Sequence, residues 1–357
     1  MKTILLNPGP VTLSERVRAA MLGPDLCHRE SEFASLQDGL QRKLLDVYGL
    51  SPRNWGATLL TGSGTAAVEA MITSMVPRDE CLLVAENGVY GERISRIATA
   101  YGIATTRVAT SWGGQLDLKA IAAALRAKPH SHIAVVHHET TTGRLNELAS
   151  LGALCRETQV GLLLDGVSSF GAEHLDFSAW PIDACAATAN KCLHGVPGTA
   201  FVIVRRAALA QAQVTRSVYF DLSEYLARQD AQGTPFTQSV QTFYALDAAL
   251  DEFFEAGGWR ARQAMFRQRM AAIRSTLATL GVGALLSEQE TSCVLQAFEL
   301  PPGRTYPALH DALKARGFII YAGQGGLSER VFRISAMGAI GDDDLARLCS
   351  ALREVLG

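Results

Sequence analysis

The chain has 357 residues, with 33 Lys and Arg against 35 Asp and Glu, which gives a formal net charge of -2. This balance gives no reason to expect a nucleic acid or an anionic membrane surface as a partner. The composition, 48% hydrophobic and 19% charged, is typical of a soluble globular protein, and the length suggests two domains or one large domain with an appendage. No apolar run approaches the ~18 residues that a membrane-spanning helix needs.

The cysteines and the first ten residues indicate the cellular compartment. The seven cysteines are scattered, odd in number and without a CxxC pair, which argues against both a disulfide framework and a metal site. The opening ten residues contain one lysine and a very short apolar run broken by Pro8, unlike a secretory signal peptide. We therefore expect a cytoplasmic protein without a bound metal.

The first chemical motif along the chain is a glycine-rich turn at residues 60–70. Gly62, Ser63, Gly64 and Thr65 directly precede an alanine-rich segment with good helix propensity. Backbone N–H groups that open a helix can bind a phosphate, and the two hydroxyls add donors. Taken alone, such a turn is more often only a loop and a helix cap.

Short apolar runs then alternate with longer amphipathic or alanine-rich segments. The predicted strands lie at residues 81–85, 105–108, 133–136 and 161–164, and the predicted helices at 93–101, 118–127 and 147–158. This alternation predicts an α/β fold with a mostly parallel sheet covered on both faces. Because ligands gather at the carboxyl ends of such strands, we expect the turns at 87–91 and 139–143 to meet Asp165 in one pocket.

Asp165 and Lys191 form a pair with a specific chemistry. Asp165 closes the apolar run 160–164, and Lys191 follows a second, smaller apolar stretch. Pyridoxal 5'-phosphate needs a lysine amine to condense with its aldehyde and a partner that keeps its ring nitrogen protonated. Alone, the aspartate would more often be a cap or turn residue and the lysine a surface residue. The order of phosphate turn, acidic strand end and lysine in one βα-patterned region favours a pyridoxal-phosphate site.

The pattern changes after the long helices expected at 247–255 and 259–280. Shorter elements follow, with strands expected at 293–298, 318–321 and 331–334 and helices at 306–316 and 342–356. We therefore expect a large α/β domain at 15–255 and a smaller C-terminal α+β domain at 256–357. The N-terminal segment 1–14 is expected to pack near the active site.

Together these motifs resemble those of the class V aminotransferases, which belong to the fold-type I pyridoxal-phosphate enzymes. The matching segments cover nearly the full chain and lie at residues 5–10, 62–70, 87–93, 137–143, 165–171, 189–198, 317–321 and 332–334. The most specific are Glu-Thr-Thr-Thr-Gly at 139–143 and Asn-Lys-Cys at 190–192, the latter followed by Gly-Val-Pro-Gly. The resemblance implies a fold-type I transferase that uses pyridoxal phosphate.

The resemblance also implies roles for single residues. Lys191 would form the imine and shuttle the proton, Asp165 would hold the ring nitrogen, and Tyr90 would stack on the ring, although Tyr90 could instead simply be a core residue. Thr237 would reach the phosphate of a neighbouring subunit, which requires a homodimer with a shared active site. Further cofactor contacts are implied for Ser63, Gly64, Thr65, Thr140, Val167 and Asn190.

Two arginines are candidates for binding the substrate. The resemblance makes Arg333 the substrate-carboxylate arginine, and its planar fork suits that task, although such an arginine is usually a surface charge. Arg29 would be a second anion-binding group, or instead the partner of Glu32 in an ion pair. The segment 27–33 departs from the phosphonate branch of the family and looks more like the alanine:glyoxylate branch, and Ser239 and Ala322 replace prolines.

The expected activity is transfer of the amino group of 2-aminoethylphosphonate to pyruvate, which yields phosphonoacetaldehyde and L-alanine. One alternative is alanine:glyoxylate or serine:pyruvate exchange, and another is a pyridoxal-phosphate lyase acting on a hydroxylated aminophosphonate. A non-catalytic cofactor-binding scaffold is disfavoured because Asp165 and Lys191 are both present. The expected partners are an amino donor, a 2-oxo acid and a second copy of the chain.

Overall fold

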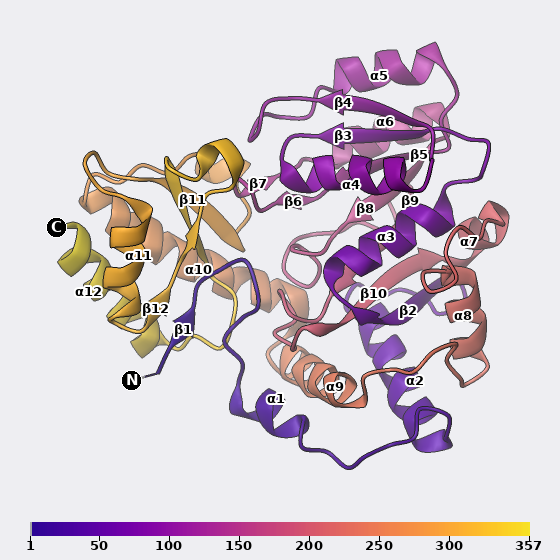
Figure 1. Cartoon of the computed structure of the whole chain (residues 1–357), viewed down its shortest axis with the longest axis horizontal. Coiled ribbons are helices and arrows are strands. Elements are labelled where there is room, and N and C mark those ends of the chain that lie inside the picture. Colours follow the sequence, from indigo (N-terminus) through magenta and orange to yellow (C-terminus); the bar gives the residue numbers. More distant parts are fainter. Residues whose placement is uncertain (1) are drawn as a thin grey trace.

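A seven-stranded sheet forms the centre of the larger part of the chain in a computed structural model (Figure 1), which describes residues 2–357. Met1 of the expected segment 1–14 lies outside the described residues. Across the sheet the strand order is β2 (Trp55–Gly62), β10 (Gly198–Arg205), β9 (Ile182–Thr188), β8 (Gly161–Asp165), β5 (His132–Val136), β3 (Leu82–Glu86) and β4 (Thr105–Ala109).

The sheet is mixed because β10 is antiparallel to both of its neighbours, whereas the other adjacent pairs are parallel. The expectation of a mostly parallel α/β sheet is confirmed. No strand was expected at residues 198–205, where β10 lies. A buried antiparallel strand is as uniformly apolar as a parallel one, so its direction is not visible in the hydrophobic pattern.

Helices cover both faces of the sheet, and strand side chains alternate between two apolar clusters. Leu83 and Ala85 of β3 pack into one cluster, whereas Leu82 and Val84 pack into the other. The first face carries α2 (Ser31–Asp46), α5 (Leu118–Ala127), α6 (Ala149–Thr158) and α9 (Val240–Glu255). The second carries α3 (Gly64–Met75), α4 (Val89–Ala100), α7 (Arg206–Ala212) and α8 (Leu222–Asp230).

Helix α4 begins at Val89, four residues before the start expected from the sequence. A distant carboxylate accounts for the difference. Glu139 accepts hydrogen bonds from the backbone N–H groups of Tyr90 at 3.1 Å and Gly91 at 3.3 Å. Because the capping group comes from another strand end, the local sequence carries no signal for it. The earlier start places Tyr90 in the first turn of the helix.

The C-terminal part has its own small antiparallel sheet and its own helices. The sheet order is β11 (Leu295–Glu299), β14 (Val331–Ser335) and β13 (Tyr321–Ala322). The helices are α10 (Gly258–Thr279), α11 (Tyr306–Lys314) and α12 (Asp342–Leu356), with short 3-10 turns η1 (Glu288–Glu290) and η2 (Gly325–Leu327). The domain boundary near residue 255 stays a prediction.

The strand expected at 318–321 is divided between two sheets. β12 (Phe318–Ile319) pairs in parallel with β1 (Ile4–Leu5), whereas β13 pairs with β14. Pairing with residues more than 300 positions away is a tertiary effect that an apolar run cannot show. A short hairpin, β6 (His138–Glu139) with β7 (Arg144–Leu145), completes the strands.

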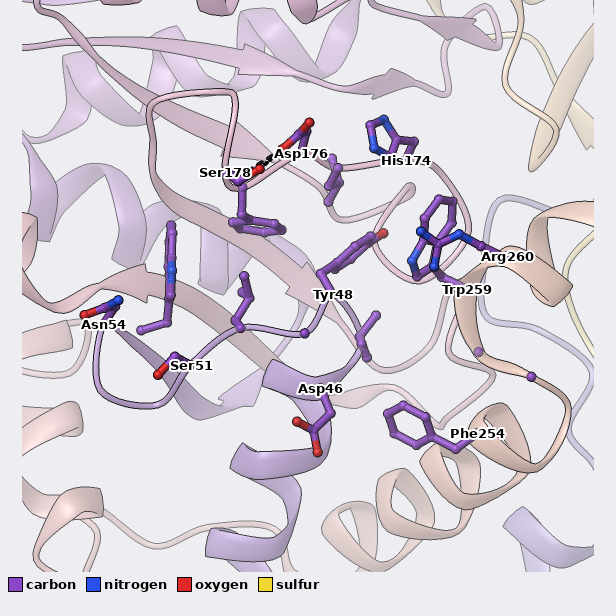
Figure 2. Close-up of a pocket in the computed structure, with 18 residues that line it drawn as sticks. Asp46, Tyr48, Ser51, Asn54, His174, Asp176, Ser178, Phe254, Trp259 and Arg260 are labelled. Atoms are coloured by element: carbon purple, nitrogen blue, oxygen red, sulfur yellow. Dashed lines mark hydrogen bonds between the residues drawn. The ribbon is translucent and has the colours of Figure 1, made fainter.

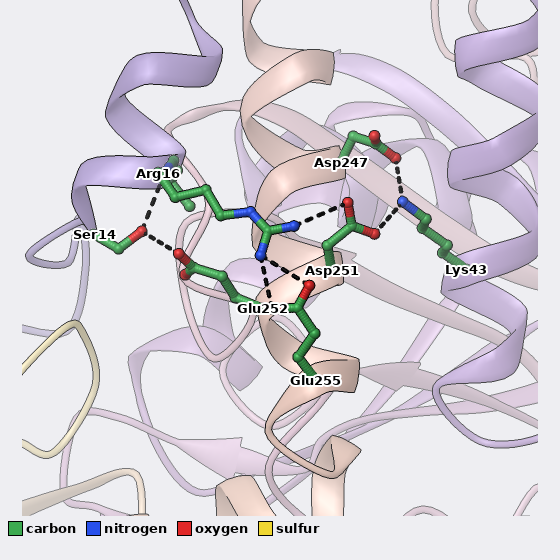
Figure 3. A network of polar contacts seen from close by, with 8 residues as sticks. Ser14, Arg16, Lys43, Asp247, Asp251, Glu252 and Glu255 are labelled. Carbon is green, nitrogen blue, oxygen red and sulfur yellow. Dashed lines mark hydrogen bonds and ion pairs between the residues drawn. The ribbon is translucent and has the colours of Figure 1, made fainter.

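The N-terminal segment runs between the two parts of the molecule. Ile4 and Leu6 are buried in the apolar cluster of the C-terminal part, and α1 (Glu15–Ala20) lies against α9. Polar contacts fasten α1 there (Figure 3). Ser14 donates to Glu252 at 2.7 Å, and Arg16 pairs with Glu255 at 2.7 Å. The chain between these two anchors is thereby held in place. Within residues 2–357, no helix has the length and apolarity to cross a bilayer.

Candidate active site

The predicted phosphate turn, Asp165 and Lys191 converge where β2, β8 and β9 end. The turn that opens α3 packs directly on the loop after β8. A Cβ added to Gly64 would lie 2.7 Å from Val167 Cγ1, so only glycine permits this approach. Thr188, at the end of β9, donates to Asn190 Oδ1 at 2.8 Å and so orders the turn before Lys191. The structure thus brings the three predicted motifs together.

Lys191 lies half-buried beneath the N-terminal segment. Its Nζ donates to the backbone carbonyl of Pro8, and a Cβ on Gly9 would lie 2.9 Å from its Cδ. Burial lowers the pKa of Lys191 to about 8, with Arg333 and Arg93 acting in the same direction and Cys192 and Asp165 opposing them. The neutral form, which a nucleophile or base requires, is therefore a minority species near physiological pH, but one far more populated than in an ordinary lysine.

Asp165 is 6% exposed and ends β8. Its Oδ1 accepts the backbone N–H of Val167 at 3.0 Å. Burial raises the pKa of Asp165 to about 6, against the opposing effects of that N–H and of the charges of Arg93 and Lys191. A buried carboxylate of this kind gains most from a cationic N–H partner, which is what a protonated ring nitrogen offers.

The start of α3 is open to an anion. Ser63 occupies the N-cap position, and its side chain forms no capping hydrogen bond. The first N–H groups of a helix have no partner within the helix, so a phosphate would satisfy them. Thr65 Oγ1 accepts from Arg93 Nη1 at 3.1 Å. Arg93 lay inside the motif at 87–93 but received no role from the sequence.

Tyr90 and Thr140 approach the site from the other strand ends. The guanidinium of Arg93 lies over the ring of Tyr90, 4.6 Å from its centroid. Thr140 is buried, and its backbone carbonyl accepts from Arg333 Nη1 at 2.8 Å. Tyr90 is half-buried and also packs against an apolar cluster of the large sheet, so its role as a core residue stays open. Its predicted stacking on the cofactor and the contact predicted for Thr140 stay predictions.

Arg333 is fully buried on β14 and lies next to Thr140. Its Nε donates to the carbonyl of Ala322 at 2.8 Å, while its Nη2 has no partner within residues 2–357. Burial lowers the pKa of Arg333, but an arginine retains its charge. A buried guanidinium nitrogen without a partner is costly, so the arrangement calls for an anionic ligand. The side chain of Gln324, 3.3 Å from Nη1, was not anticipated.

Arg29 and Thr237 are exposed and lie apart from this cluster in the single chain. Arg29 follows α1 in the loop before α2, and no ion pair in residues 2–357 joins it to Glu32. Thr237 lies in the loop before α9, where the next two residues bind Thr61 Oγ1 at 2.7 and 2.9 Å. That loop is therefore close to the end of β2. The roles of both residues stay predictions.

Two histidines near the site are structural. His137 and His138 are both buried, and burial lowers the pKa of each to about 4. His138 Nδ1 contacts the carbonyl of Ser168 at 3.1 Å. Both rings are therefore neutral at physiological pH, which leaves Lys191 as the better candidate for proton transfer.

One surface hollow lies away from the predicted chemistry, whereas another adjoins it. One of about 710 Å³ lies between the end of α2, the loop at 174–178 and the α9–α10 junction, and none of the predicted site residues lines it (Figure 2). Another, of about 810 Å³, is bordered by Thr65 and Arg93 and so adjoins the open start of α3.

Comparison with known proteins shows to which family the chain belongs. Residues 43–333 match the sequence profile of the family described as aminotransferase class-V. The chain belongs to this family. It is 37% identical to the 2-aminoethylphosphonate–pyruvate transaminase of Aeromonas hydrophila over 355 residues, which cover 97% of this chain and 92% of that protein. The chain is thus a pyridoxal-phosphate-dependent aminotransferase, which uses an amino donor and a 2-oxo acid.

Solved structures agree with this family. The aspartate aminotransferase of subgroup IV from Thermus thermophilus superposes with a TM-score of 0.91 at 28% identity and covers 99% of both chains. The alanine–glyoxylate aminotransferase from Nostoc sp. gives a TM-score of 0.91 at 26% identity, covering 100% of this chain and 96% of that one. The expected fold-type I architecture is confirmed.

The side chains present fit pyridoxal phosphate. The uncapped start of α3 suits its phosphate, the buried carboxylate of Asp165 suits a cationic ring nitrogen, and the partly neutral amine of Lys191 suits its aldehyde. When bound, the cofactor supplies an electron sink for the carbon that loses a proton.

Proposed function

We propose that this aminotransferase takes the amino group of 2-aminoethylphosphonate and passes it to pyruvate, which yields phosphonoacetaldehyde and L-alanine. The full-length similarity to the Aeromonas transaminase supports this donor and acceptor. The donor carries a phosphonate and the acceptor carries a carboxylate, so both half-reactions need a cationic anchor for an anion.

The observation that carries the proposal is the free Nη2 of buried Arg333. Its Nε and Nη1 are held by the carbonyls of Ala322 and Thr140, which fix the plane of the guanidinium. A fixed, desolvated guanidinium binds a carboxylate or a phosphonate with charge-assisted hydrogen bonds. It would therefore orient the donor and the acceptor in turn against the same reacting position.

Lys191 would move the proton in both half-reactions. With a pKa lowered to about 8 by burial, its amine accepts a proton from the amine-bearing carbon of the substrate and can return one. In the structure, the amine donates a hydrogen bond to the carbonyl of Pro8. The N-terminal segment would also exclude water from the amine, which keeps it desolvated.

The other assigned roles are part of the same proposal. Asp165 would keep the ring nitrogen protonated, Tyr90 would stack on the ring, and Thr140 and Asn190 would bind at its edge. Ser63, Gly64 and Thr65 would bind the phosphate of the cofactor. Val167 would also contact the cofactor. We further propose that Arg29 contributes to anion binding at the pocket mouth and that the enzyme acts in the cytoplasm, which the free cysteines support.

We also propose a homodimer in which Thr237 of each subunit contributes to the site of the other. Thr237 is exposed, although its loop is anchored to Thr61 beside the phosphate turn. A hydroxyl held at the surface next to an anion site is available to a second copy of the chain. In the dimer, the Thr237 hydroxyl of each subunit would thus complete the phosphate site of the other subunit.

Single-turnover absorbance without any oxo acid tests the donor. The purified enzyme is mixed separately with 2-aminoethylphosphonate, L-alanine, L-serine and a phosphonate-free amine. Conversion of the cofactor's imine band to the pyridoxamine form by 2-aminoethylphosphonate, faster than by the phosphonate-free amine, is the expected result. Conversion by alanine or serine alone would refute the phosphonate donor and favour the exchange catalysed by the Nostoc relative.

A further inference from the structure

We infer that Arg93 is a positioning residue of the cofactor site, which orients the phosphate-binding hydroxyl of Thr65 and the stacking ring of Tyr90 at the same time. The inference rests on the proposed function only in that the chain binds pyridoxal phosphate at the start of α3. The sequence motifs gave Arg93 no role.

The first contact is with the phosphate turn. Arg93 Nη1 donates to Thr65 Oγ1 at 3.1 Å. Because this donor occupies a lone pair of the hydroxyl oxygen, the hydroxyl proton is free to point toward an anion at the open helix start. The cationic donor also brings a positive charge to within one side chain of the expected phosphate.

The second contact is with the stacking residue. The Arg93 guanidinium lies 4.6 Å from the centroid of the Tyr90 ring. The two residues are three positions apart on α4, which places them on one helix face. A cation on one face restricts the ring of Tyr90 to a narrow range of orientations. Tyr90 and Thr65 are therefore coupled through one guanidinium.

The charge of Arg93 is left free for an anionic ligand. None of the ion pairs in the described residues includes Arg93, although Glu69 and Glu92 line the same hollow. These carboxylates are engaged elsewhere, Glu69 with the hydroxyl of Tyr101 at 2.6 Å and Glu92 with the indole N–H of Trp112 at 2.8 Å. Arg93 also contributes to the electrostatic environment of both Asp165 and Lys191.

Binding of pyridoxal phosphate to the apoenzyme, measured by equilibrium dialysis and by absorbance, tests this role without any substrate. Arg93→Gln is expected to raise the Kd for the cofactor about tenfold, because one charge-assisted hydrogen bond at the phosphate turn is lost. At saturating cofactor, the variant is expected to show altered circular dichroism in the visible band, because the ring of Tyr90 is no longer held.

The matched control is Arg96→Gln, one turn further along α4, where the side chain is exposed. It is expected to leave the Kd and the dichroism unchanged. Melting of each apoprotein checks the fold, and Arg93→Met, which retains the apolar stem, replaces Arg93→Gln if the latter does not fold. Equal effects at Arg93 and Arg96, or a wild-type Kd and dichroism in the Arg93 variant, would overturn the inference.

A double-mutant cycle tests whether Arg93 acts through Thr65. If it does, combining Arg93→Gln with Thr65→Val raises the Kd no further than the more damaging single change. Multiplication of the two single effects would refute the coupling. Absence of cofactor binding by the wild-type chain would instead contradict the proposed function, so the two failures are distinguishable.

Discussion

At the level of a single residue, the buried carboxylate of Asp165 lowers the folding stability of the chain. Its pKa is raised by burial from 3.8 to about 6, so the folded chain binds this proton more strongly than the unfolded chain does. Below the window between pH 3.8 and about 6, the carboxyl is protonated in both the folded and the unfolded chain, so burying it costs no stability. As the pH rises through the window, the folded state loses stability, and above it the loss is constant.

We therefore predict that Asp165→Asn stabilises the apoprotein at neutral pH. The pKa difference corresponds to at most about 3 kcal/mol, at ~1.4 kcal/mol for each tenfold change in proton affinity. Urea unfolding of both apoproteins across the window measures it, and the gain should shrink as the pH falls toward 3.8. A gain that does not depend on pH would contradict the burial argument.

Arg333 leads to a prediction about the acceptor. Arg333→Gln should lower kcat/KM for pyruvate by roughly 10- to 100-fold, because charge-assisted hydrogen bonds to the carboxylate are lost. Cofactor binding should persist, since Arg333 contacts Thr140 only through its backbone carbonyl, and the side chain of Thr140 proposed to meet the cofactor is left in place. Steady-state kinetics with varied pyruvate measures the effect. An unchanged KM and kcat would rule out this anchor.

At the level of the element, α1 depends on one hydroxyl. Ser14 Oγ accepts the N–H of Val17 at 3.1 Å and donates to Glu252 of α9 at 2.7 Å, so the same atom caps α1 and fastens it (Figure 3). Ser14→Ala should cost about 1 kcal/mol locally, which corresponds to roughly fivefold faster amide exchange in α1. Hydrogen-exchange mass spectrometry of residues 14–21 measures this.

Ser275→Ala is the matched control for Ser14. Ser275 is exposed in the interior of α10, where no hydrogen bond within residues 2–357 uses its side chain. Alanine there should be neutral or slightly stabilising, because it has the higher helix propensity. Equal exchange rates in α1 for the wild type and Ser14→Ala would show that other contacts, such as Arg16 with Glu255, hold the helix.

At the level of the whole molecule, the proposed shared site predicts complementation between two inactive chains. Lys191→Ala removes the amine, and Thr237→Glu places a carboxylate beside the partner's phosphate. In a hybrid dimer, one site carries both changes and the other carries neither. A doubly tagged hybrid should therefore recover about half of the activity of a wild-type dimer.

The two homodimers are the controls, and each should have little activity. If Thr237 instead serves the phosphate of its own subunit, each site of the hybrid carries one change and no activity returns. That outcome would disprove the shared site while leaving the cofactor assignment untouched. Loss of dimers in the Thr237 variant, seen by light scattering, would place the residue in the interface itself.

Much of the fold was predictable because periodicity is local. The chain spacing of apolar residues predicted α5 at its observed bounds and strands β3, β5 and β8 to within a residue or two. The opposite direction of β10 and the pairing of β1 with β12 were not predictable. They are set by contacts between distant segments, and a buried apolar run has the same pattern whichever neighbour it meets.

The chemistry of the site was also predictable only in part. The amino-acid sequence alone identifies the reactive groups, a lysine, an aspartate and a glycine-rich turn, since these are residue types in a fixed order. The protonation states and free hydrogen-bonding groups of these side chains depend on the folded environment. Burial sets the pKa of Lys191 near 8 and that of Asp165 near 6, and it leaves one nitrogen of Arg333 without a partner. Desolvation depends on everything packed around a group, and no local motif records it.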